Sequence, residues 1–293
     1  MTALSPKEAV RRYSTAMSQD YRLRGPLVGG ETGATLIEGS DGERRVLKWE
    51  SDPSNQALRS EAITLAEMLR VDAEWPVPRQ HAVWMGEWLF VSQDFMPGEP
   101  IARLSHGLVD ELLSMHRRRL GLVVAQGDDH WGQEMIEILV DGGNGYCLHE
   151  PLRSYDARTR RVVERIEEMG RALDPADLPG GGVVHGDLHP GNMLQIEGRL
   201  SAVVDLDYAR VGDPVFDLTM LAVASLEHDV EAGVRRRLMV AGVESLESEQ
   251  RAAYIGNLLL RLLDWPIRKG RVDEIEFWLT MADRLLGDAI ADL

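Results

Sequence analysis

Cysteine is almost absent from this chain, in which Cys147 is the only one among 293 residues. A single thiol excludes an intramolecular disulfide and a thiolate zinc cage within one chain, as is usual for a reducing compartment. No apolar run approaches the roughly 18 residues that cross a bilayer, and residues 1–14 carry no apolar segment of a signal peptide. We therefore expect a cytoplasmic protein with no membrane partner.

Basic residues are in deficit as well. The chain has 32 Lys and Arg against 48 Asp and Glu, a formal net charge of −16. Nucleic acids and anionic membrane surfaces bind to basic patches, so neither is expected as a partner. The acidic excess favours cationic partners, although it can equally serve solubility alone. The charge pattern specifies no oligomeric state.

The N-terminal part of the chain is rich in strand patterns. Residues 34–38 and 44–49 flank the turn sequence Gly39-Ser40-Asp41-Gly42, which predicts a hairpin. Apolar residues at helical spacing over 55–71 predict an amphipathic helix that packs on this hairpin. We also expect a first helix over residues 6–19 and another hairpin arm over 84–95.

The rest of the chain is dominated by helical patterns. The breakers in Met96-Pro97-Gly98-Glu99-Pro100 place a boundary between an N-terminal lobe, residues 1–97, and a C-terminal lobe, residues 98–293. Helices are predicted at 108–119, 155–173, 216–226, 230–239, 248–263 and 272–286. The expected fold class is α+β, with a strand-rich N-terminal lobe and a mostly helical C-terminal lobe.

The most informative stretch runs from Val183 to Asn192 and continues with Val203-Val204-Asp205-Leu206-Asp207. An apolar pair leads to Asp187, and a Pro-Gly break then holds Asn192 five residues downstream. Phosphoryl transfer needs a carboxylate that orients the attacking hydroxyl, and oxygen ligands for magnesium. The sequence therefore predicts Asp187 as a catalytic residue and Asn192 and Asp205 as Mg²⁺ ligands.

This arrangement resembles the aminoglycoside phosphotransferase and choline kinase family, small-molecule relatives of the protein kinases that share the histidine-glycine-aspartate loop. The resemblance covers roughly residues 27–226. It implies a bilobal protein-kinase-like fold, with ATP or GTP and Mg²⁺ as cofactors. His189 stands where the protein-kinase loop often has lysine, so the resemblance implies that it approaches the γ-phosphate as a second catalytic residue. His185 is expected to brace the loop by hydrogen bonding.

Two segments of the N-terminal lobe are candidates for nucleotide contacts. The turn at residues 28–33 holds Gly30 and Gly33, where backbone amides could approach phosphates closely. The turn is followed by a strand pattern rather than a helix, which disfavours a dinucleotide fold. At the position that binds the adenine edge in the resembling family, the backbone groups of Asp94 and Met96 are the expected contacts.

A lysine and a helix glutamate complete the expected nucleotide site. In kinases a strand lysine binds the α- and β-phosphates and is held by a glutamate of the following helix. Lys48 ends the predicted hairpin, and Glu61 lies within the predicted helix. We expect Lys48 to bind the phosphates and Glu61 to hold it, with Glu67 as the alternative partner farther along the helix.

The acceptor is expected to be a small molecule that docks against the C-terminal helices. Candidate residues for its site are the acidic Glu227, Asp264, Glu274 and Glu276, and the aromatic Trp265. Acceptors in the resembling family include aminoglycosides, cationic peptides, macrolides, choline, other amino alcohols and sugars. An acidic protein with an acidic pocket favours a cationic antibiotic and a role in resistance. A metabolic kinase of choline, an amino alcohol or a sugar is the alternative.

Three further readings of the motif are weaker. His185, Asp187 and His189 alternate like metal ligands on a strand of a metal-dependent hydrolase, but the following Pro-Gly pair opposes a straight strand. A protein kinase is disfavoured, because residues 205–217 are too short for an activation segment and no Ala-Pro-Glu follows. A catalytically dead module is disfavoured because no essential residue is missing.

Asp207 either assists the metal through water or caps the next turn.

Overall fold

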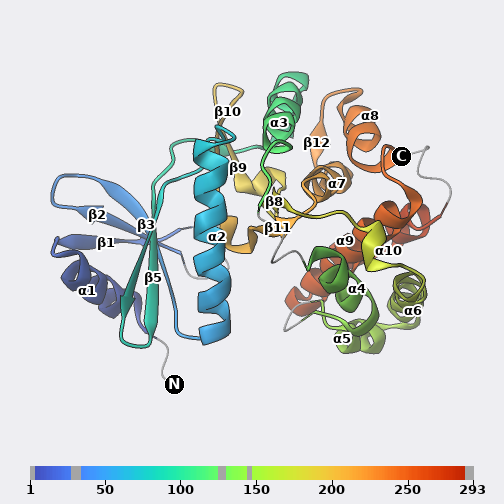
Figure 1. Ribbon diagram of the computed structural model, residues 1–293, viewed down its shortest axis with the longest axis horizontal. Helices are drawn as coiled ribbons and strands as arrows, with labels where there is room; N and C mark the ends of the chain where they lie inside the picture. The colour runs from blue at the N-terminus through green and yellow to red at the C-terminus, as the bar shows by residue number, and fades with distance from the viewer. Residues whose placement is uncertain (1–3, 28–33, 125–129, 144–146, 288–293) are drawn as a thin grey trace. The chain divides into compact units, whose positions relative to one another are not determined.

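A computed structural model describes residues 4–27, 34–124, 130–143 and 147–287. The chain forms two compact units (Figure 1). The first comprises Met1–Ile101, His185–Asp187 and Gly191–Arg210, and the second comprises Ala102–Val184, Leu188–Pro190 and Val211–Leu293. The lobe boundary at residues 97 and 98 stays a prediction. Two short stretches from the later half of the chain belong to the first unit.

A five-stranded antiparallel sheet is the frame of the first unit, in the order β1-β2-β3-β5-β4. Its strands are β1 (Tyr21–Pro26), β2 (Thr35–Gly39), β3 (Arg44–Glu50), β4 (Gln80–Met85) and β5 (Trp88–Asp94). The predicted hairpin is confirmed, since β2 pairs with β3 from Thr35 opposite Leu47 to Glu38 opposite Arg44. The second hairpin reverses at Gly86, whose φ of 60° is left-handed.

Helix α1 (Pro6–Met17) confirms the first predicted helix and covers one face of this sheet. Its buried Tyr13 packs in a core cluster with Leu47 and Phe90. Because successive side chains of a strand point to opposite faces, Leu47 on the α1 side puts Lys48 on the other side. Figure 1 shows helix α2 (Pro53–Val71) on that other side of the sheet.

Helix α2 (Pro53–Val71) confirms the predicted amphipathic helix. It begins where the side chain of Asp52 accepts a hydrogen bond of 2.8 Å from the backbone N–H of Ser54, with Pro53 in the first turn. Its buried face carries Ala62, Leu65, Ala66 and Leu69. The helix also contacts the short 3₁₀ turn η3 (Leu206–Tyr208), which directly follows the predicted metal ligand Asp205. Helix α2 therefore lies close to this aspartate.

A small three-stranded sheet completes the first unit, in the order β10-β9-β6. Strand β9 (Met193–Ile196) follows the turn η2 (Pro190–Asn192) and pairs with β10 (Arg199–Val203) and with β6 (Glu99–Pro100). The backbone N–H of Val203 donates a 2.9 Å hydrogen bond to the carbonyl of Pro76. A paired strand therefore follows Asn192 directly, and another ends two residues before Asp205.

The second unit is mostly helical. Its helices are α3 (His106–Arg119), α4 (Trp131–Asp141), α5 (His149–Tyr155), α6 (Ala157–Arg171), α7 (Val215–Ala224), α8 (Val234–Met239), a π-helical turn at Val240–Glu244, α9 (Ser248–Lys269) and α10 (Val272–Leu285). The six predicted helical segments each contain a helix, and the expected α+β class with a strand-rich and a helical part is confirmed. Helices α4 and α5 were not predicted. None of the described helices combines the length and apolarity needed to span a membrane.

One helix boundary differs from the prediction. The segment expected as a helix over 230–239 begins with strand β12 (Asp229–Val230), which pairs in parallel with β7 (Arg103–Leu104). Helix α8 starts only after Gly233, whose φ of 79° is a left-handed conformation that favours glycine. Pairing with a distant strand therefore overrides the local helical pattern.

The core of the second unit contains a fully buried aromatic cluster of Trp131, Phe216 and Tyr254. The rings of Trp131 and Phe216 meet edge to face with centroids 5.3 Å apart. The hydroxyl of Tyr254 donates a 2.6 Å hydrogen bond to Asp213. The cluster thereby ties α9 and α4 to the segment that follows the motif.

Candidate active site

Asp187 is held by the residue that ends the motif. The side-chain amide of Asn192 donates a 2.9 Å hydrogen bond to the backbone carbonyl of Asp187 and another of 2.9 Å to its Oδ2. Asp187 is partly exposed, so one carboxylate can be both oriented and accessible. A fixed, accessible carboxylate is what the orientation of an attacking hydroxyl requires.

His185 braces this loop, as expected. Its Nδ1 accepts a 3.2 Å hydrogen bond from the backbone N–H of Asp187, and its Nε2 lies 3.0 Å from the carbonyl oxygen of Val204, to which it donates. Both ring nitrogens are therefore engaged within the protein. His185 is not available as a ligand, which argues against the metal-dependent hydrolase.

Gly186 is required by a close approach of two backbone segments. Its φ is 79°, and a Cβ atom at this position would lie 2.5 Å from the carbonyl oxygen of Tyr208. The glycine thus lets the Asp187 loop pack directly against the turn that follows Asp205.

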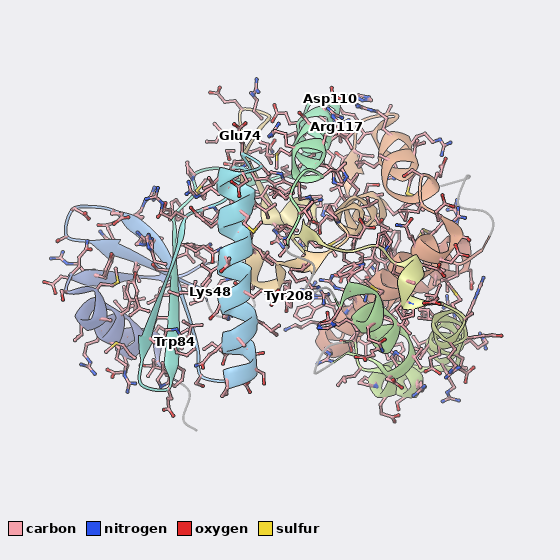
Figure 2. All side chains as sticks on the ribbon, viewed as in Figure 1. Lys48, Glu74, Trp84, Asp110, Arg117 and Tyr208 are labelled. Atoms are coloured by element: carbon pink, nitrogen blue, oxygen red, sulfur yellow. The ribbon has the colours of Figure 1, made fainter. Side chains whose placement is uncertain are left out.

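Lys48 lies beside helix α2 (Figure 2). Its ammonium group contacts two carboxylates. Its Nζ is 2.8 Å from Oδ1 of Asp205 and 2.8 Å from Oδ2 of Asp207. Only 8% of the Lys48 side chain is exposed. Burial alone would lower the pKa of Lys48, but the charges of Asp207 and Asp205 outweigh it and leave the pKa raised. Lys48 is therefore a fixed cation over the metal loop.

The backbone at Asp205 is in a left-handed conformation, with φ 61° and ψ 58°. Such a conformation is uncommon outside glycine and clusters at functional positions. It turns the chain from β10 into η3, so that the carboxylates of Asp205 and Asp207 both reach Lys48.

The expected pair of Lys48 with Glu61 is not formed among the described residues. Glu61 is exposed, and it is Arg59 that faces the metal loop from α2, with its Nη1 3.0 Å from Oδ2 of Asp207. The reason is helical geometry, because two residues along a helix rotate the side chain by roughly 200°. The alternative partner Glu67 forms an exposed ion pair with Arg70.

The remaining residues predicted to contact the nucleotide are Gly30, Gly33, Asp94 and Met96. Gly30 and Gly33 lie outside the described residues. The backbone N–H of Asp94 donates to the carbonyl of Arg79 at 3.0 Å, and its carboxylate lies 3.2 Å from Arg45. Met96 follows the end of β5 and is partly exposed. Their contact with an adenine ring stays a prediction.

The donors present fit a magnesium ion held together with phosphates. Asp205 offers a carboxylate that is 38% exposed, and Asn192, whose amide nitrogen points to Asp187, retains its carbonyl oxygen as the other end of the amide. The ammonium group of Lys48 between two carboxylates shows that this place stabilises a cation. In the described parts of the chain, no three His, Cys, Asp or Glu side chains form a metal cage. Mg²⁺ commonly uses few protein ligands and completes its shell with phosphate and water.

Residues 26–254, which are more than half of the chain, match the phosphotransferase enzyme family. The chain belongs to this family. It is a phosphotransferase. The match spans most of the strand-rich unit, the motif and most of the helical unit.

Solved structures show the same fold at low sequence identity. Aminoglycoside phosphotransferase APH(4)-Ia is similar with a TM-score of 0.63 and 16% identity, covering 95% of this chain and 97% of that one. A thermostable mutant of it in ternary complex with ADP and hygromycin B has a TM-score of 0.62, 16% identity and coverages of 95% and 97%. The gentamicin complex of APH(2")-IIa has a TM-score of 0.61, 15% identity and 99% coverage of both chains. Together they establish the protein-kinase-like fold. No curated protein matches the sequence.

Two acidic residues that were predicted for the acceptor site of this phosphotransferase, Glu227 and Glu274, lie near one another in the second unit. Partial burial raises the pKa of Glu227 and the carboxylate of Glu274 adds to the effect, although Glu227 is exposed as a whole. His228, Arg271 and His189 oppose this shift. The predicted catalytic His189 therefore interacts electrostatically with Glu227, one of the residues predicted for the acceptor site.

The other acceptor candidates have partners within the protein. Asp264 is fully buried and accepts hydrogen bonds from the backbone of Cys147 at 3.1 Å and from Arg268 at 2.8 Å. Glu276 pairs with Arg158 at 2.6 Å, and the Nζ of Lys269 lies 4.3 Å above the ring of Trp265. These contacts stabilise the helical unit, and the full burial of Asp264 makes its carboxylate inaccessible to a ligand.

Two functional side chains were missed from the sequence. Arg59 carries a signal that could have been used, since it shares with Ala62 and Ala66 the spacing of the buried face of α2. Arg119 is fully buried and pairs with the equally buried Asp217. No local pattern distinguishes Arg119 from the two arginines before it.

Proposed function

We propose that this phosphotransferase transfers the γ-phosphoryl group of ATP to a hydroxyl group of a small cationic molecule of the antibiotic type. The observation that carries the proposal is the Asp187–Asn192 pair, which unites an oriented carboxylate with a metal-ligand amide. The Lys48–Asp205 contact in the same unit adds a phosphate-binding cation.

Each residue has one role in the proposed reaction. Asp187 accepts a hydrogen bond from the acceptor hydroxyl and orients its oxygen towards phosphorus; it takes up the proton as transfer proceeds. Lys48 binds the α- and β-phosphates, and Asn192 and Asp205 hold Mg²⁺, which supplies charge neutralisation when bound. His189 is assigned to the γ-phosphate as a hydrogen-bond donor. Positioning and electrostatics dominate such a reaction because its transition state is loose.

A cationic acceptor is supported by the net charge of the chain and by two carboxylates of its second unit. The net charge is −16, and Glu227 and Glu274 are close enough for the carboxylate of one to raise the pKa of the other. A cation bound between them would relieve this repulsion. Two of the solved relatives are bound to cationic antibiotics, one to hygromycin B and the other to gentamicin.

The test is a direct search for the phosphorylated product. The protein is incubated with ATP and Mg²⁺ and a pooled panel of aminoglycosides, cationic peptides, macrolides, amino alcohols and sugars, and mass spectrometry identifies any compound that gains a phosphoryl group. Asp187→Ala is the matched control, since it removes the orienting carboxylate and leaves the nucleotide residues in place. GTP in place of ATP defines the donor.

The outcomes separate the alternatives. A cationic antibiotic modified by the parent and not by Asp187→Ala supports the proposal. Modification of choline, another amino alcohol or a sugar alone replaces the antibiotic with a metabolic acceptor. Failure to bind either nucleotide in the presence of Mg²⁺ would refute the assignment of the site.

A further inference from the structure

We propose that Asp207 is the carboxylate that positions Lys48 for the nucleotide, and that Arg59 orients Asp207. This role was expected of the helix glutamate Glu61. The inference rests on the proposed function, because it assigns two positioning residues within the same nucleotide site. Asp207 stands in the motif as Asp205-Leu206-Asp207, two residues after the proposed metal ligand.

Lys48 and Arg59 contact the same oxygen atom of Asp207, Lys48 through a charged hydrogen bond and Arg59 through an ion pair. Oδ2 of Asp207 lies 2.8 Å from Nζ of Lys48 and 3.0 Å from Nη1 of Arg59. The three side chains are only 8%, 18% and 13% exposed for Lys48, Asp207 and Arg59. Charges enclosed to this degree are screened weakly by solvent, so they hold one another in place more strongly than surface pairs do.

Asp207 differs from Asp205 in its exposure and in its proposed role. The side chain of Asp205 is 38% exposed, twice the exposure of Asp207, and it is a proposed ligand of Mg²⁺. A divalent cation on Asp205 would repel the ammonium group of Lys48. Asp207, enclosed and flanked by Arg59, is the carboxylate that remains with Lys48 when nucleotide and metal are bound.

Helix α2 presents Arg59 to the metal loop and Glu61 to solvent. Arg59 lies three residues before Ala62, on the buried face of the helix, whereas Glu61 is exposed. Turning Glu61 towards Lys48 would require α2 to rotate by roughly 200° and expose that face. Arg59 also balances charge, because Lys48 and Arg59 together neutralise Asp205 and Asp207.

The contact itself is tested on the protein without nucleotide. Lys48 is acetylated with a small amine-reactive reagent, and the rate of its modification is followed by peptide mass spectrometry in the parent and in Asp207→Asn, Glu61→Gln and Asp72→Asn. Asp72→Asn is the matched control, an exposed carboxylate at the end of α2. Asp207→Asn should raise the Lys48 rate by roughly tenfold, as for loss of one charge-assisted hydrogen bond, and the other two should not. A larger effect of Glu61→Gln than of Asp207→Asn would overturn the assignment.

The positioning role is tested by kinetics with whichever acceptor the wild-type enzyme uses. Asp207→Asn should lower kcat by roughly 10- to 100-fold with a smaller change in KM for ATP, and Asp207→Glu should restore part of it. Arg59→Met should show the same split in weaker form. Recovery of Asp207→Asn by excess Mg²⁺ would make Asp207 a metal ligand, and an unchanged kcat with lowered Tm would make it a turn cap. Either result overturns the proposal.

Failure of the proposed function is recognised separately. If the wild-type protein binds no nucleotide, the assignment of the site is wrong whatever the variants do, and the labelling result then reports only an ion pair. If the wild-type protein binds nucleotide and Asp207→Asn behaves like the wild type in labelling and in kcat, the proposed function stands and this inference falls.

Discussion

The side-chain amide of Asn192 donates to both the backbone carbonyl and the carboxylate of Asp187, at 2.9 Å in each case. One amide therefore performs two tasks, since its nitrogen fixes Asp187 while its oxygen is the proposed metal ligand. These tasks can be separated, because a carboxylate at this position keeps an oxygen ligand and loses the donor.

Asn192→Asp should retain the response to Mg²⁺ and lose turnover. The new carboxylate cannot donate to Asp187 and repels it, so we expect kcat to fall by roughly 10²- to 10⁴-fold, the range for a misplaced acid-base group. The measurement is kcat over a Mg²⁺ titration, with Asn192→Ala as the variant that loses both tasks. A turnover close to that of the wild type would show that the hydrogen bonds to Asp187 do not orient it.

Gly186→Ala should destabilise the first unit far more than the same change at Gly198. Both glycines have nearly equal φ values, 79° and 78°, but a Cβ at Gly186 meets the backbone of Tyr208 at 2.5 Å, and a Cβ at Gly198 meets nothing within 4 Å. We expect about 1 kcal/mol for Gly198→Ala from the left-handed backbone alone, and about 3 kcal/mol or more for Gly186→Ala. Urea unfolding gives both values, and equal losses would mean that the close approach costs nothing.

Local features of the site could be predicted from the sequence. Asp187 and Asn192 are five residues apart, and the Pro-Gly break between them dictates the turn that joins them. The hairpin of β2 and β3 was predictable for the same reason, because a short turn sets its register. In both cases the information lies within a few residues.

The rest depends on contacts between distant segments. Lys48 and Asp207 are 159 residues apart, and no local pattern states which carboxylate faces which lysine. The choice between Arg59 and Glu61 depends on the rotation of α2 about its axis, which the sheet determines. Strand β12 likewise forms through its pairing with β7. A motif search identifies the chemistry, and packing decides the partners.

Arg119 and Asp217 form an ion pair in which neither side chain is exposed. Removing one partner leaves an uncompensated buried charge, so Arg119→Met should lower the free energy of unfolding by about 3–5 kcal/mol. The double variant Arg119→Met/Asp217→Asn should lose less free energy of unfolding than the sum of the losses in the two single variants. Urea unfolding measures each term, with Arg117→Met on the exposed side of the same helix as the control. Strict additivity would indicate that the two side chains do not interact.

His116 contacts the buried Arg119–Asp217 ion pair and makes the stability of the protein sensitive to pH. Burial lowers the pKa of His116 from 6.5 to about 4, and the charge of Arg119 acts in the same direction, opposed by Asp217. Its Nδ1 lies 2.9 Å from Nη2 of Arg119 and accepts that donor, which only the neutral ring can do. His116 is therefore neutral in the folded protein, whereas its pKa in the unfolded chain is the ordinary value of 6.5.

The sign of the effect follows from proton binding. Between pH 6.5 and about 4 the unfolded chain binds a proton on His116 that the folded protein does not, so stability falls as pH is lowered through this window and the loss levels off below it. The full loss is about 3 kcal/mol. Urea unfolding across this window should show a weaker pH dependence in His116→Gln than in the wild type, because glutamine keeps an acceptor and does not titrate. His81→Gln, an exposed histidine, should leave the dependence as it is. If His116→Gln and His81→Gln gave the same profile, the neutral buried imidazole would not be a source of acid sensitivity.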